Sequence, residues 1–231
     1  MATSAHPDFK APFLLGTWGF TRVFFLSDRK CTMANDVTAK TRDEGTSTEK
    51  KLDDLYALID GIETCMMTTR RPDGQLVSRP MQVQERTAGT DLWFVTDYET
   101  NKLDELLTDP HVNLAFFNNR SREWVSVSGT ALVTRDRDLI RGLYKPDWKA
   151  WFPDQGGNRD GSPDDPRLAL IQVEAQSVMY MKSTKSRPMM LFEVVKAMIT
   201  GDAPEVGEER ELGQREIEKA RRIEQERPLG A

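Results

Sequence analysis

The hydrophobic pattern first predicts an amphipathic helix near residue 50. Thr46 and Glu49 stand at the spacing of a capping box, in which a hydroxyl and a carboxylate satisfy free amides at a helix start. Residues 33–47 ahead of the helix are polar and rich in threonine, so we expect them to be disordered. The apolar residues that follow recur at helical spacing, and they are Leu52, Leu55, Tyr56, Ile59 and Ile62.

Beyond this helix the pattern changes to that of strands. Short runs rich in β-branched and aromatic residues are separated by turn sequences such as RPDG, TAGT and NNRS. Six strands in meander and Greek-key order predict a mainly β protein, a closed or partly closed antiparallel barrel. The six runs cover residues 63–70, 75–84, 91–97, 111–119, 123–135 and 168–182.

Short helices are expected at the connections of this barrel. The segment YETNKLDELLTDP has Thr100 as its N-cap and Pro110 just past its end. DRDLIRGLY and, after the last strand, RPMMLFEVVKAMIT also have the composition of helices. We therefore expect small helices to flank the barrel.

The chain divides into three expected parts. Residues 1–47 form a non-core extension, residues 48–200 the barrel domain, and residues 201–231 a charged, frayed tail that could carry a surface helix near 211–222. The apolar window at 11–26 is too short to cross a bilayer and contains an arginine. We interpret it as part of the extension; the alternative, a targeting presequence, does not suit the aspartates on either side.

Composition narrows the function classes. The 231 residues carry a net charge of −5, with a pI of about 5.3 and a mean hydropathy of −0.57, so no basic surface for nucleic acid is expected. Cys31 and Cys65 lack CxxC spacing, which favours a reduced, cytoplasmic protein without a zinc site. His6 and His111 are the only histidines, which argues against a histidine metal site or a Ser-His-Asp triad. We expect His111 to lie at a strand end.

Arg79 and Pro80 are unusual inside an apolar strand. An edge strand tolerates proline, so Arg79 could be a surface residue on such an edge. The alternative is that Pro80 frees this edge from pairing and that a ligand lies along it. Arg79, a planar fork of donors, would then bind an anionic or hydrogen-bond-accepting group.

A second candidate lies where a helix begins. Lys102 follows the expected cap Thr100 by two residues, where free amides and the helix dipole favour a phosphate. Thr96 closes the preceding strand, so the three side chains would surround one small volume. Lysine is usually better placed at the other end of a helix. A bound anion would explain its position here; the alternative is a solvated helix lysine.

The sequence motifs that contain these residues, taken in their order along the chain, resemble those of one known family. LVSRPM, LWFVTDYETNKLDEL, PHVNLAFFN, EWVSVSGTALVTRDRDLI, WKAWFPD and DDPRLALIQVE are similar to the general stress protein group of FMN-binding split barrels, in the pyridoxamine 5′-phosphate oxidase-like superfamily. The resemblance runs from about Leu52 to Ile199 and is nearest to fungal blue-light-induced members. Each motif is weak alone, but six in order carry the resemblance.

The resemblance implies a six-stranded antiparallel split β-barrel, paired as a homodimer with FMN at the interface. FAD and a deazaflavin are the alternative cofactors. Trp124 resembles the strand that approaches the flavin from the partner subunit. Trp148, Trp151 and Phe152 resemble an aromatic segment over the pocket, or else pack in the core or dimer interface. The residues that match the flavin-lining strands and the phosphate-binding turn are Arg79, Pro80, Met81, Val95, Thr96, Thr100, Asn101 and Lys102.

The chain departs from the true pyridoxamine phosphate oxidases. It lacks their C-terminal Glu-Phe-Trp and Arg-Leu-His-Arg signatures, and no general base can be placed near the flavin. We expect a flavin-dependent oxidoreductase linked to stress response, with unknown substrate and electron donor, in which the flavin carries the electron chemistry. The alternatives are a flavin carrier or sensor without turnover and a flavin-free interaction module.

Overall fold

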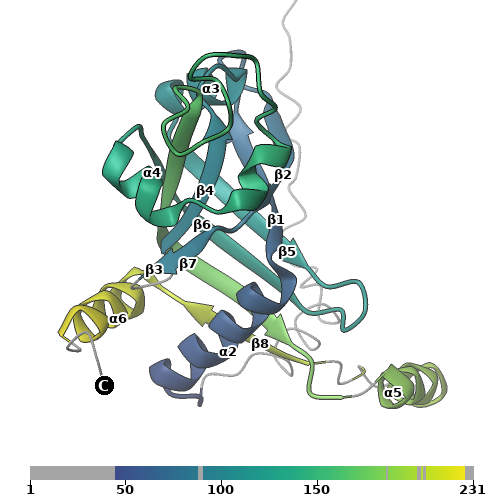
Figure 1. Cartoon of the computed structure of the whole chain (residues 1–231). Helices are drawn as coiled ribbons and strands as arrows, with labels where there is room; N and C mark the ends of the chain where they lie inside the picture. Colours follow the sequence, from purple (N-terminus) through teal and green to yellow (C-terminus); the bar gives the residue numbers. More distant parts are fainter. Residues whose placement is uncertain (1–44, 88–90, 186, 202–203, 205–206, 227–231) are drawn as a thin grey trace, which may run out of the picture.

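An antiparallel sheet curled into a barrel forms the body of the protein, which confirms the predicted fold class (Figure 1). The computed structural model describes residues 45–87, 91–185, 187–201, 204 and 207–226. Nearly all of the expected N-terminal extension, the turn residues 88–90 and the last five residues lie outside this description. Within it, none of the helices has both the length and the apolar character that crossing a membrane requires.

All the described strands belong to one sheet. They are hydrogen-bonded in the order β2-β1-β5-β6-β7-β4-β3, and β8 pairs with β7 outside this path. Each pairing is antiparallel. The strands are β1 (Thr64–Arg70), β2 (Leu76–Gln82), β3 (Glu85–Thr87), β4 (Asp91–Asp97), β5 (His111–Phe117), β6 (Trp124–Thr134), β7 (Leu168–Lys182) and β8 (Glu208–Leu212).

The chain itself joins the two ends of this sheet. Only Val83 and Gln84 separate β2 from β3, although these strands lie at opposite ends of the hydrogen-bonded path. The Val83 amide donates to the carbonyl of Glu63 at 2.9 Å, and the Gln84 amide donates to the carbonyl of Trp93 at 2.8 Å. The barrel is therefore closed by a bent strand. β2 and β4 come close to each other without a described strand pairing between them.

The helices follow the predicted order with small shifts. The N-cap of α2 is Ser47, whose hydroxyl accepts from the Lys50 amide at 3.3 Å, so the expected cap at Thr46 is one residue early. Thr100 is the N-cap of α3, as expected. The helices are α2 (Thr48–Ile62), α3 (Asn101–Thr108), α4 (Arg137–Leu143), the 3₁₀ helix η2 (Pro146–Ala150), α5 (Arg187–Thr200) and α6 (Gln214–Glu226).

Two strands lie outside the six predicted runs. β3 continues the second run past its bend, and β8 lies in the tail that was expected to be frayed. β8 pairs with the end of β7, where Lys182 is opposite Glu208 and Val178 is opposite Leu212. The expected surface helix is present as α6, but it begins at Gln214 because Glu211 belongs to β8.

A buried carboxylate explains how the charged sequence EEREL can join the sheet. Asp54 on α2 is 4% exposed and accepts hydrogen bonds from Lys50 at 2.8 Å, from Lys182 on β7 and from Arg210 on β8. Arg210 is itself buried, so its charge is compensated inside the protein rather than by water. The Asp54 carboxylate therefore ties together α2, β7 and β8.

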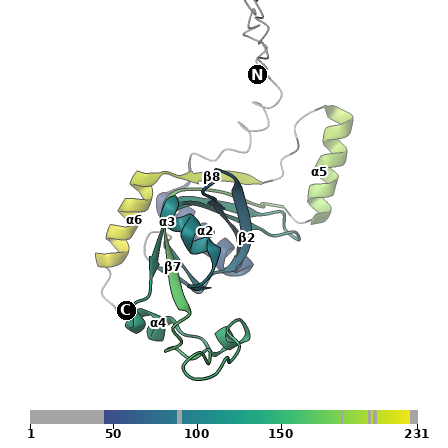
Figure 2. The ribbon, with the colours of Figure 1, turned by 90° about the horizontal axis from the view of Figure 1, so that it is seen from above.

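Two hydrophobic cores fill the structure. The larger core lies inside the barrel and under α2, where Leu55, Leu114 and Val127 are completely buried. The smaller core lies between the outer side of β4 and β7 and the segment of α4 and η2, and it includes Trp93, Ile140, Trp148, Phe152, Leu168 and Leu170. Figure 2 shows α4 and its following segment gathered on one side of the barrel. This second core supports one wall of the cavity described below.

Replacing Asp54 with asparagine should destabilise the protein and remove part of its acid sensitivity. Burial raises the pKa of Asp54, but hydrogen bonds from Lys182, Lys50 and Arg210 outweigh burial and lower it to about 2. Since the unfolded pKa is near 3.8, this contribution is present above about pH 4 and is lost as the pH falls toward 2. It amounts to about 2 kcal/mol. Urea unfolding at pH 7 and pH 3 should show a smaller pH difference for Asp54→Asn than for the wild type. An equal pH difference would contradict this role.

Candidate functional site

A cavity of about 260 Å³ opens where β2 and β4 lie side by side without pairing. Because Pro80 has no backbone donor, β2 offers one site fewer at which a further strand could pair. β2 is hydrogen-bonded to β1 on one side, and β4 is hydrogen-bonded to β3 and β7. The lining residues come from β2 and its bend, β4, the start of α3 and the η2 segment: Pro80, Met81, Gln82, Gln84, Val95, Thr96, Asp97, Thr100, Lys102, Asp147, Trp148, Trp151 and Phe152.

Lys102 connects the two walls of this cavity. Its Nζ donates to Thr96 Oγ1 on β4 at 3.1 Å and contacts Met81 Sδ on β2 at 3.1 Å. A thioether is a weak acceptor, so neither partner neutralises the ammonium. Among the residues that the structure describes, no carboxylate lies within salt-bridge distance of Lys102. The cavity wall therefore contains a cation that lacks a direct counter-charge.

The environment of Lys102 disfavours its charge. Burial and, to a smaller extent, the nearby charge of Arg79 together lower the pKa of Lys102 to about 8, while Glu105 acts in the opposite direction. A bound anion would raise the pKa of Lys102 again, because its negative charge favours the protonated ammonium. The site is therefore suited to an anionic group at this end of the cavity.

The start of α3 adds donors beside Lys102. The side chain of the cap residue Thr100 makes no capping hydrogen bond to the helix; its hydroxyl donates to the carbonyl of Asp97 at 2.9 Å. The first-turn amides therefore receive no side-chain cap, and the positive end of the helix dipole lies at the cavity. Asn101, also expected at the phosphate-binding turn, is exposed and does not line the cavity.

Arg79 is engaged within the chain rather than in the cavity. Its guanidinium donates two hydrogen bonds to Glu105, at 2.8 and 2.7 Å, and one to Thr69 Oγ1 at 3.0 Å. Glu105 is buried, and its pKa is lowered chiefly by the hydrogen bond from Arg79. Arg79 does not line the cavity, so its expected direct role toward an anion has no support in this geometry. Its charge acts on the site indirectly, through Lys102.

The η2 segment forms one wall of the cavity. Its aromatic residues were expected either to cover a pocket or to pack in a core or dimer interface. Trp148 is 1% exposed, and its Nε1 donates to Gln84 Oε1 at 2.7 Å. Lys145 donates to the Gln84 carbonyl at 2.7 Å, so two bonds attach this segment to the bend between β2 and β3. Trp148 and Phe152 belong to the smaller core, whereas Trp151 is 77% exposed and lines the cavity.

Two carboxylates at the cavity could not be placed from the sequence. Asp97 ends β4, and its side chain accepts from the Glu99 amide at 2.8 Å, which shapes the turn into α3. Asp147 is exposed on η2. Gln84 was also missed, because no sequence signal marks a residue in a bend between two strands.

Trp124 lies elsewhere on the barrel. It begins β6 and is opposite Phe117 on β5 and Met181 on β7. Trp124 does not line the cavity of its own chain. The expectation that it reaches a flavin from the partner subunit therefore concerns a second copy and stays a prediction.

Comparisons with known proteins agree with this architecture. The family described as "Pyridoxamine 5'-phosphate oxidase like" matches residues 50–205. Protein bli-3 of Neurospora crassa is 39% identical over 176 residues, which span 75% of this chain and 84% of that protein.

Two solved structures show the same fold at low sequence identity. A putative general stress protein 26 from Jannaschia sp. CCS1 has a TM-score of 0.56 and 20% identity, over 71% of this chain and 99% of that one. A Clostridium acetobutylicum protein related to general stress protein 26 has a TM-score of 0.51 and 19% identity, over 59% and 92%.

Replacing Lys102 with methionine should stabilise the free protein. The folded pKa of about 8 lies below the unfolded value near 10.5, so below pH 8 the buried charge costs up to about 3 kcal/mol. This cost falls as the pH rises from 8 toward 10.5, because the folded state loses its proton first. Urea unfolding at pH 7 should show Lys102→Met more stable by about 1–3 kcal/mol, with a smaller gain at pH 10. The exposed Lys149→Met serves as the control, and an equal gain there would contradict the explanation.

Removing Arg79 should destabilise the fold because it leaves Glu105 buried and unpaired. We expect Arg79→Ala to lower the free energy of unfolding by about 2–4 kcal/mol. The double variant Arg79→Ala/Glu105→Gln should recover much of this loss, since no buried charge is then left uncompensated. Denaturant unfolding of both variants measures the difference, and a double variant no more stable than Arg79→Ala would exclude this pairing as the cause.

Proposed function

The chain belongs to the pyridoxamine 5′-phosphate oxidase-like family, and on this premise we propose that it binds FMN in the cavity between β2 and β4. The observation that carries the proposal is Lys102, a partly buried ammonium without a counter-charge within salt-bridge distance among the described residues. We further propose that the protein is a flavin-dependent oxidoreductase of stress response acting on a small molecule. A true pyridoxamine phosphate oxidase activity is not proposed.

The phosphate of FMN would lie at the start of α3. Lys102 would donate to it as a point charge, and the Thr100 hydroxyl would turn toward it. The amides of Asn101 and Lys102 would complete the set of donors, since the Leu103 amide already donates to the Thr100 carbonyl at 3.1 Å. Phosphate oxygens accept several such bonds at once. We prefer FMN to FAD because one phosphate supplies the negative charge that Lys102 lacks.

The flavin ring would lie against β2 and β4, the two strands that lie side by side without pairing; we call this gap in the hydrogen bonding the seam. Met81, Val95 and Trp151 give this part of the cavity apolar walls, while Gln82 and Gln84 offer polar groups. When bound, FMN would supply one- or two-electron transfer to or from a small molecule. The residues of this chain would bind and orient the flavin, and the Trp148–Gln84 bond would hold the η2 wall in place.

The size of the cavity favours a second copy of the chain. Its 260 Å³ is smaller than the roughly 300–1,000 Å³ of most ligand sites. We propose that a homodimer completes the site and that Trp124 of the second copy contributes to it. The free thiol of Cys65, buried and with a pKa raised to about 12 by burial, suits the cytoplasmic location that we propose.

Comparing FMN with riboflavin tests the proposal, because the two ligands differ only by the phosphate. We expect the wild type to bind FMN more tightly than riboflavin by about 1.5–3 kcal/mol, the value of a charge-assisted hydrogen bond. In Lys102→Met the two affinities should become nearly equal, while Lys149→Met should behave as the wild type. Flavin fluorescence quenching during titration measures both affinities.

Two outcomes would contradict the proposal at different levels. A protein that stays colourless through gel filtration with added FMN, and quenches neither flavin, would exclude flavin binding. A protein that holds FMN but is not bleached by NADH or NADPH under anaerobic conditions would favour a carrier or sensor over an oxidoreductase driven by these donors.

A further inference from the structure

The helix α5 projects from the barrel as an arm. It lies in the connection between β7 and β8, which pair up to Lys182 and Glu208. Both ends of the connection therefore leave the barrel at the same place. Figures 1 and 2 both show α5 standing away from the sheet. We use "arm" for residues Arg187–Thr200.

One side of the arm is broadly apolar and exposed. Its residues follow the i, i+3, i+4, i+7 spacing of a helix that packs on another surface. Their exposed fractions run from 36% for Val194 to 82% for Met198. This "arm stripe" consists of Leu191, Phe192, Val194, Val195, Met198 and Ile199.

An uncovered arm of this kind is unfavourable in water. A helix of 14 residues is marginal without tertiary packing. The arm stripe exposes on the order of 700 Å², close to the roughly 800 Å² that each partner of a stable interface buries. Neither hydrophobic core of the chain includes a residue of the arm. The arm therefore needs a surface that its own barrel does not provide.

Polar contacts fix the base of the arm. Lys185 Nζ lies 3.0 Å from Glu193 Oε1, and the Ser183 amide donates to Glu123 Oε1 at 3.2 Å. Glu193 is on the opposite side of the helix from the arm stripe. These contacts turn the stripe outward from its own chain.

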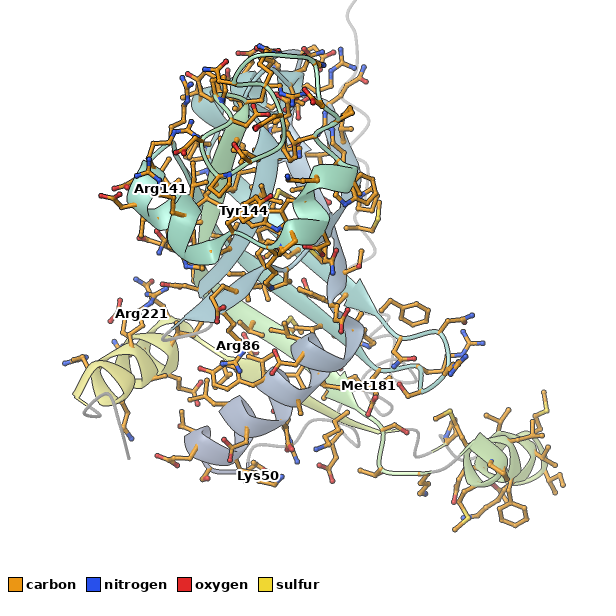
Figure 3. The ribbon with its side chains drawn as sticks, in the orientation of Figure 1. Lys50, Arg86, Arg141, Tyr144, Met181 and Arg221 are labelled. Carbon is orange, nitrogen blue, oxygen red and sulfur yellow. The ribbon has the colours of Figure 1, made fainter. Side chains whose placement is uncertain are left out.

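The outer face of the barrel carries an apolar patch. Two rows of paired residues cross the neighbouring strands here. The first row is Phe117, Trp124 and Met181. The second row runs from Met66 through Ala115 and Ser126 to Met179. Phe117, Met66 and Met179 are among the exposed large apolar residues. Figure 3 shows Met181 at the end of the sheet from which the arm extends. This "barrel patch" is Met66, Phe117, Trp124, Met179 and Met181.

We propose that the arm stripe of each copy packs onto the barrel patch of a second copy, in a reciprocal exchange about a two-fold axis. Both surfaces are exposed on the same chain, so one symmetric dimer covers both at once. Neither the arm stripe nor the barrel patch contains a charged residue. The proposal rests on the homodimer of the proposed function, and the two share one residue, because Trp124 of the barrel patch is also proposed to reach the flavin cavity of the other copy. No residue of the arm stripe or the barrel patch lines the cavity of its own chain, and the variants below leave Trp124 unchanged. Dimer formation through the arm can therefore be tested without flavin.

Analytical ultracentrifugation of the full chain, with and without FMN, tests the exchange. The arm variant is Val195→Glu/Met198→Glu, and the patch variant is Phe117→Glu/Met179→Glu. Each should raise the dimer Kd about 100-fold, because charged groups would enter a buried apolar contact. The control Lys196→Glu adds a carboxylate to the other side of the arm and should leave Kd within about threefold. Circular dichroism verifies that each variant is folded.

Mixing the two variants separates arm exchange from pairing between two arms. A heterodimer of arm variant and patch variant keeps one intact contact, the normal arm on the normal patch. We expect the mixture to form more dimer than either variant alone.

Three results would overturn the proposal. They are a wild type that stays monomeric at high concentration, a patch variant or arm variant that dimerises as the wild type does, and a mixture without gain. A monomeric wild type that floats with phosphatidylcholine and phosphatidylserine vesicles, while the arm variant does not, would show that the arm binds lipid instead. The proposed function is tested separately by the FMN affinity, so FMN binding without arm-dependent dimers would contradict only the arm exchange.

Discussion

The bend at Val83 and Gln84 is the constraint on which the site depends. It lets one continuous stretch of chain supply both ends of the sheet, so that the barrel closes without hydrogen bonds between β2 and β4. Backbone groups along the open seam then need other partners, and a cavity can form there without breaking a strand pair. Gln84 also binds Trp148 through its side chain and Lys145 through its carbonyl. The same bend that closes the barrel therefore positions the opposite wall of the cavity.

Two positive side chains lie beside the seam, but only one of them has a negative partner. Two cations, Arg79 and Lys102, lie near one buried carboxylate, Glu105, and the bidentate geometry of Arg79 gives it that partner. Lys102 is left with a hydroxyl and a thioether, which cannot neutralise it. A fold selected only for stability would favour an apolar residue here, so the retained ammonium is best explained by a ligand that supplies the missing charge.

Sequence patterns predicted the order of elements well where a local signal existed. The helical spacing around Leu55, the turn sequences RPDG and NNRS and the cap at Thr100 depend on neighbouring residues, and the structure agrees with them to within one or two positions. β8 was missed because its one inward charge, Arg210, is satisfied by Asp54 more than 150 residues earlier in the chain. The pairing of Arg79 with Glu105 could not be predicted for the same reason, because Glu105 lies on another element; direct binding of a ligand by Arg79 stays a prediction. Trp148 and Trp151 have similar sequence surroundings, and only the tertiary fold buries one and exposes the other.

The exposed apolar face of the arm concerns the assembly of two chains. Its sequence predicts a helix, and the structure contains one, yet helical spacing alone cannot say what covers an apolar face. Because the barrel closes through its own bent strand and both cores are complete without α5, the stability of the single fold does not explain the apolar residues of the arm. Their conformational and hydration cost is offset only where another surface buries them. The barrel patch at the root of the arm offers that surface on a second copy, so a contact between copies accounts for both exposed surfaces with one interaction.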